Sequence, residues 1–182
     1  MARIPYPDPA TQSIEVRDRL KRIGSLNVTR MMSYAEAPMM AYSKLGTTLL
    51  LRGKLDPVLR EIVILRIGQL CGSAYEWHQH VSVARAVGMD ESTLKAVEDL
   101  AFDRLTEEQQ AAVAIAEDIK LRSGASPETF ARAQRFFSPE QLVEICLVAG
   151  HYIMTAGLLL TFDVEIEDGP ALGESMKAGG TA

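Results

Sequence analysis

Apolar residues along the chain recur with the spacing of helices. The clearest pattern is a 15-residue span that has Glu61, Arg66 and Gln69 on one side and contains the β-branched residues Ile62, Val63, Ile64 and Ile67. This length and pattern favour a helix over a strand. Residues 14–23 and 38–51 are also typical of helices, and no segment shows the alternation of a convincing strand.

Residues of the kind that begin helices separate these apolar segments. A capping side chain directly before a proline, or a Ser or Thr followed three residues later by Glu or Gln, marks a helix N-terminus. Such signals occur at Asp56-Pro57, Ser73–Glu76, Asp90, Thr106–Gln109, Ser126-Pro127 and Ser138–Gln141. We therefore predict an all-α fold of about seven or eight helices.

The length of 182 residues indicates one domain with a substantial core. Residues 1–12 contain three prolines and are expected to form an extended arm, and residues 13–167 are expected to form a single helical domain. Residues 168–182 are small and polar, and we expect a flexible tail. The segment that begins at Glu61 resembles the segment that begins at Glu144. Two related helical hairpins and a chance similarity both remain open.

Composition and charge narrow the classes of function. Hydrophobic residues make up 47% and charged residues 24%, which excludes disorder of the whole chain. The net charge of −5 disfavours nucleic acid and membrane surfaces as partners. Polar residues interrupt the apolar segment 142–164, so we expect a buried helix rather than a membrane span. Two cysteines and a start unlike a signal peptide indicate a cytoplasmic protein.

The chemically informative residues lie between positions 61 and 80. If Ser73 caps a helix, Glu76 and His80 are four residues apart on one helix face. Glu61 lies on the preceding helix, and an antiparallel hairpin would bring it alongside. Carboxylates beside an imidazole can transfer protons near neutral pH, because imidazoles titrate there and burial moves carboxyl groups towards that range.

Structural roles for the same residues stay open. Glu76 fits a capping box, His80 fits a core histidine, and Glu61 fits a solvated charge pair with Arg60. A metal site is not expected, because His78 and His80 point about 200° apart on a helix and cannot share one ion.

The motif resembles the carboxymuconolactone decarboxylase family, whose superfamily includes the AhpD-type alkylhydroperoxidases. In the peroxidase branch a glutamate precedes a Cys-x-x-Cys and a histidine. In this sequence Glu61 occupies the glutamate position and His80 the histidine position, whereas Ser73 and Glu76 replace the two cysteines. The dithiol mechanism therefore does not carry over. The pattern is similar to the decarboxylase branch, whose members use no metal or organic cofactor.

The resemblance implies an all-α AhpD-like fold and a lyase that acts on a small carboxylated or lactone substrate. It implies His80 as the acid or base, with Glu76 and Glu61 tuning or relaying its proton. Arg66 is our choice to bind the substrate anion, together with Ser73 and Tyr75, although other arginines remain open. A homo-oligomer, as a trimer, hexamer or dimer, is also implied.

Two other functions remain open at this stage. One is a peroxidase-like activity that uses Cys71 alone, and the other is a non-catalytic oligomer that binds a small acid. The roles of Cys71 and His151 are undetermined by the sequence.

Overall fold

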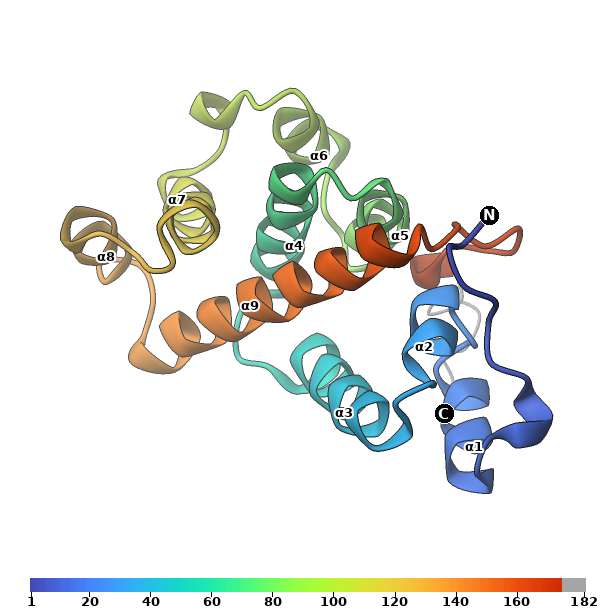
Figure 1. Ribbon diagram of the computed structural model, residues 1–182. Coiled ribbons are helices and arrows are strands. Elements are labelled where there is room, and N and C mark those ends of the chain that lie inside the picture. The colour runs from blue at the N-terminus through green and yellow to red at the C-terminus, as the bar shows by residue number, and fades with distance from the viewer. Residues whose placement is uncertain (175–182) are drawn as a thin grey trace.

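The computed structural model describes residues 1–174, which contain helices and no strand (Figure 1). The α-helices that lie wholly within these residues are α1 (Ile14–Arg22), α2 (Asn27–Met32), α3 (Glu36–Arg52), α4 (Pro57–Cys71), α5 (Ala74–Ala86), α6 (Glu91–Glu98), α7 (Glu107–Arg122), α8 (Pro127–Ala133) and α9 (Pro139–Phe162). Two 3-10 helices are η1 (Pro9–Thr11) and η2 (Phe102–Arg104). The prediction of an all-α fold is confirmed.

The predicted N-terminal caps begin these helices. The Asp56 carboxylate accepts hydrogen bonds from the backbone amides of Val58 and Leu59 at the start of α4. Full capping boxes begin α7 and α9. The hydroxyls of Thr106 and Ser138 accept from the backbone amides of Gln109 and Gln141, whose side-chain oxygens accept from the amides of Thr106 and Ser138. These bonds satisfy amides that no helical carbonyl can reach, so local sequence sets where the helices start.

The sequence analysis did not predict helix α2, because no side chain of its own segment caps it. Its first amides are bound by distant residues instead. The Glu167 carboxylate accepts from the Asn27 amide at 2.5 Å, and the Tyr75 hydroxyl accepts from the Val28 amide at 3.4 Å. This short helix therefore depends on tertiary contacts.

Helix α9 crosses the middle of the molecule, with α4 to α7 on one side and α3 on the other (Figure 1). Helices α1 and α2 lie near its C-terminal end. Its inner face packs into the main core, whose fully buried side chains include Ile64, Ile67, Ile115 and Ile145. Helix α9 is long and apolar enough to cross a membrane, and 44% of its most apolar window is buried inside this fold.

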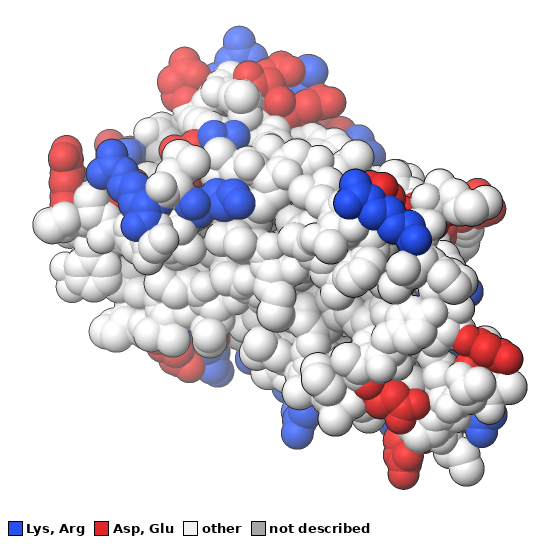
Figure 2. All heavy atoms as spheres, viewed as in Figure 1, with Lys and Arg blue, Asp and Glu red and all other residues white. Residues whose placement is uncertain are grey.

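The outer face of α9 is apolar and exposed. Val143, Leu147, Met154 and Leu160 are each about half exposed there. Figure 2 shows acidic and basic residues around the rim of this side of the molecule and few across its centre, where α9 runs. Exposed apolar surfaces of this kind often mark interfaces. The homo-oligomer implied by the family resemblance stays a prediction.

The segment that follows α9 packs back onto α5. The Leu172 amide donates to Gln79 Oε1 at 2.7 Å, and the Gly173 amide donates to Ser82 Oγ at 2.9 Å. Residues 168–174 of the expected tail therefore make specific contacts, and residues 175–182 lie outside the described part. The expected N-terminal arm contains η1 and is tied to α9 by the Arg3 amide, which donates to the Phe162 carbonyl.

Glu144 on α9 fixes the connection between α3 and α4. Its carboxylate accepts hydrogen bonds from the backbone amides of Lys54 and Leu55 at 2.7–2.8 Å. This role differs from that of Glu61, although the two surrounding segments are similar in sequence.

We expect Glu144→Ala to lower the free energy of unfolding by about 1–2 kcal/mol, because two backbone amides lose a charged acceptor. Urea denaturation measures this change. Glu140→Ala is the matched control, since Glu140 is exposed on the same helix. Equal stability of the two variants would show that the Glu144 contacts contribute nothing.

Candidate functional site

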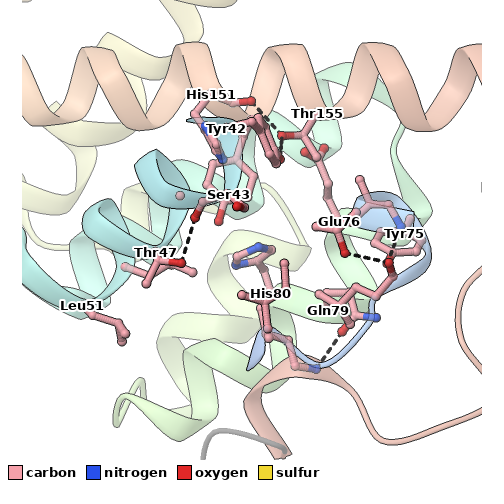
Figure 3. Close-up of a pocket in the computed structure, with 18 of the residues that line it drawn as sticks. Tyr42, Ser43, Thr47, Leu51, Tyr75, Glu76, Gln79, His80, His151 and Thr155 are labelled. Carbon is pink, nitrogen blue, oxygen red and sulfur yellow. Dashed lines mark hydrogen bonds between the residues drawn. The ribbon is translucent and has the colours of Figure 1, made fainter. Parts of the chain in front are cut away.

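A cavity of about 240 Å³ lies between α3, α5 and α9. Figure 3 shows His151 and Thr155 entering it from α9, opposite side chains of α3 and α5. One end is exposed and carries Arg22 and Leu51. The buried part is lined by Tyr42, Gly46, Tyr75, Glu76, Gln79, His80, His151, Tyr152 and Thr155, among others.

The connection between α4 and α5 brings Glu61 against His80. Gly72 ends α4 in the left-handed conformation (φ 69°), and Ser73 caps α5, so the two helices join directly. His80 Nδ1 and Glu61 Oε2 lie 2.7 Å apart. Since Glu61 occupies Nδ1, the other ring nitrogen, Nε2, is left for the cavity that His80 lines.

Arg60 compensates the burial of Glu61, whose exposed fraction is 0%. Arg60 Nε lies 3.0 Å from Glu61 Oε1, and its Nη1 donates to the Leu50 carbonyl at 2.9 Å. A buried carboxylate needs such partners, because removing it from water is costly. The charge pair of Glu61 with Arg60 exists, but it is buried rather than solvated.

Glu76 faces the cavity without forming the expected capping box. The Ser73 hydroxyl accepts from the Glu76 amide at 3.3 Å, but the Glu76 carboxyl oxygens have no hydrogen-bond partner in the protein. The capping role of its side chain is therefore wrong. Burial raises the pKa of Glu76 to about 8, so this carboxyl is mainly protonated at neutral pH.

His151 is a cavity residue whose role the sequence left undetermined. Its ring stacks on Tyr42, with centroids 4.3 Å apart, and burial lowers its pKa to about 4, so it is neutral at pH 7. The Thr155 hydroxyl donates to the His151 carbonyl and is bonded to the Tyr42 hydroxyl, which fixes this wall. No spacing rule links His151 to the motif at 61–80.

The Tyr152 ring packs against both His80 and His151. It meets His80 edge-on at a centroid distance of 4.7 Å and His151 at 5.3 Å. The predicted substrate-binding residue Tyr75 also lines the cavity, and its hydroxyl is bonded to the Glu167 carboxylate.

The other two predicted substrate-binding residues lie elsewhere. Ser73 is buried as the cap of α5 and does not line the cavity. Arg66 pairs with Glu117 at 2.6 Å and stacks on Phe102, so its guanidinium is not brought to the site. Arg22, which the sequence analysis did not single out, is the basic residue that lines the cavity.

The two cysteines also lie outside the cavity lining. Burial raises the pKa of both Cys71 and Cys146, which disfavours the thiolate that nucleophilic or redox chemistry needs. His78 is exposed while His80 is buried, so these two residues lie on different faces of α5.

Residues 37–118 match the carboxymuconolactone decarboxylase family, and this range contains Glu61, Glu76 and His80. The matched segment is similar to this family in sequence, and most of the chain shares the AhpD-like fold of the solved structures. No curated protein gives a significant match.

Solved structures share the fold at low identity. A peroxidase-related protein with an AhpD core from Ralstonia eutropha JMP134 is 16% identical with a TM-score of 0.81, over 92% of this chain and 93% of that one. A putative antioxidant defence protein AhpD from Agrobacterium tumefaciens is 20% identical with a TM-score of 0.66, over 75% and 97%. A variant of the debrominase Bmp8 in complex with 2,3,4-tribromopyrrole is 15% identical with a TM-score of 0.74, over 98% of each chain.

We expect Glu76 to lower the stability of the protein as the pH rises from about 4.5 to 8, whereas buried His151 acts in the opposite direction between about 4 and 6.5. The unfolded chain releases the Glu76 proton near 4.5, whereas the folded protein holds it up to about 8, so the folded state binds more protons in this window. Glu76→Gln should remove this loss, which is on the order of 4–5 kcal/mol by linkage.

Urea denaturation at several pH values measures the effect. Glu140→Gln is the control for a glutamate that is exposed to solvent. If wild type and Glu76→Gln gave parallel stability curves between pH 5 and 8, the buried neutral state of Glu76 would be refuted.

Proposed function

We propose that the cavity is the active site of a cofactor-independent lyase, which decarboxylates a small carboxylated lactone and returns a proton to carbon. The observation that carries this proposal is that His80, which is hydrogen-bonded to buried Glu61, lines one small cavity together with Glu76, whose carboxyl group is unpartnered. The family match adds support, since it covers the same residues.

His80 is the proposed acid. In the reaction, the bond between a ring carbon and its carboxylate breaks, CO₂ leaves, and the electron pair spreads into the unsaturated lactone. His80 Nε2 then delivers a proton to carbon, while Glu61 holds the ring through Nδ1 and stabilises the charged imidazole before it donates. Solvent returns a proton to His80.

Glu76 is proposed to stabilise the negative charge that collects on the lactone carbonyl oxygen. Because burial keeps its carboxyl group protonated at neutral pH, it can donate a hydrogen bond there. An ionised carboxylate at this place would repel the same charge.

The cavity favours a small cyclic ligand. Its walls are aromatic and aliphatic, with Tyr42, Tyr152 and Leu50 among them. The debrominase of the same fold was solved with 2,3,4-tribromopyrrole, a compact ring. That likeness supports a ring of similar size here, whereas the absence of Cys71 and Cys146 from the lining disfavours thiol chemistry.

We expect His80→Ala to lower CO₂ release from carboxymuconolactone by about 10²–10⁴-fold, the usual effect of losing a general acid. His78→Ala is the matched control on the same helix, and an unchanged melting temperature verifies that each variant is folded. Full activity of His80→Ala would contradict the assignment.

We expect Cys71→Ala to leave CO₂ release unchanged, because this thiol does not line the cavity. The rate at which wild type consumes an organic hydroperoxide tests the same point. Consumption that is faster than by free cysteine, and that is lost in Cys71→Ala, would favour the peroxidase alternative.

A further inference from the structure

Two residues that line the cavity carry unpartnered buried polar atoms. Among residues 1–174, the buried side-chain nitrogen and oxygen atoms without a hydrogen-bond partner are both Glu76 carboxyl oxygens and His151 Nδ1. Both residues are at least 95% buried, and both line the cavity. Buried polar groups in proteins are almost always partnered, so two exceptions on one cavity point to a polar ligand between them.

The position of His151 is set by the helix that faces it. Gly46 on α3 leaves room for the ring, because a β-carbon at that residue would lie 2.9 Å from His151 Nε2. Stacking on Tyr42 fixes the plane of the imidazole. The ring is thus held from two sides while its Nδ1 remains without a protein partner.

The two ends of the cavity differ in charge. Glu76 and His151 at the buried end are both uncharged at neutral pH, because burial disfavours their ionised forms. Arg22 is an exposed residue of the lining, and its Nε donates to the Asp18 carbonyl at 3.3 Å. A ligand that matches this arrangement has a neutral polar group at one end and an anionic group at the other.

We propose that His151 is a further substrate-binding residue, which donates a hydrogen bond from Nδ1 to the same lactone carbonyl oxygen that Glu76 binds, while Arg22 binds a carboxylate at the cavity mouth. This inference rests on the proposed function for the choice of a lactone. It adds a second neutral donor for the developing oxyanion and fixes the orientation of the substrate.

Equilibrium binding of unreactive probes tests the proposal separately from turnover. The probes are 5-oxotetrahydrofuran-2-acetate, its methyl ester, and tetrahydrofuran-2-acetate, which lacks the carbonyl. Wild type should bind the lactone acid at least about tenfold more tightly than the ether acid, since one hydrogen bond is worth about that factor. His151→Ala should reduce this preference.

Gly46→Ala is the second variant, because it should displace the imidazole without removing any polar group. It should reduce the preference for the lactone in the same way, while an alanine within α3 favours the helix. Arg22→Met should weaken both acids and leave the ester unchanged, and Arg104→Met, an exposed arginine that does not line the cavity, is its control.

Infrared spectra of the ¹³C-labelled carbonyl give a readout that a purely structural role would not change. The carbonyl stretch of the bound lactone should lie at lower frequency in wild type than in His151→Ala. The proposal is overturned if wild type binds neither lactone, or if both the preference and the frequency persist in His151→Ala and Gly46→Ala. Lactone binding with these variant effects but without turnover would refute the proposed reaction alone.

Discussion

The buried hydrogen bond between Glu61 and His80 is the interaction around which the molecule is organised. A carboxylate with no exposed surface requires compensation, and Arg60 and His80 together supply it. These contacts join four helices, because Arg60 also binds the Leu50 carbonyl of α3 and His80 meets Tyr152 of α9. The pair that we assign to proton transfer is therefore also part of the core.

The contrast between this charged cluster and the neutral cavity beside it defines the proposed chemistry. Glu61 has two partners for its carboxylate, whereas Glu76, fifteen residues later, has none and is protonated at neutral pH. Two carboxyl groups near one histidine thus have different environments. One can orient and stabilise an imidazole, and the other can donate a hydrogen bond to a developing anion.

The sequence predicts the elements whose signals are local. Capping residues such as Asp56 and Ser138 locate helix starts. The spacing of Glu61, Glu76 and His80 predicts a shared site, and in the structure Glu61 bonds to His80 while Glu76 lines the same cavity as His80. Local signals fail where a distant residue supplies the partner. Helix α2 is capped by Glu167, far along the chain, so no pattern within its own six residues reveals it.

The remaining differences have the same origin. The Arg66 side chain could bind an anion, but it pairs with Glu117 on α7 outside the cavity. His151 enters the cavity because α9 packs across α4 and opposite Gly46, and this packing leaves no signal at a fixed spacing from His80. Which face of a helix meets a cavity depends on tertiary packing.

Deuterium uptake provides the most direct test of proton transfer by the Glu61–His80 pair. The enol-lactone that decarboxylation of carboxymuconolactone leaves would be incubated with the protein in D₂O and followed by NMR. The account predicts that wild type exchanges the proton at the carbon that the reaction protonates, and that His80→Ala does not. No exchange by folded wild type, or equal exchange by His80→Ala, would contradict it.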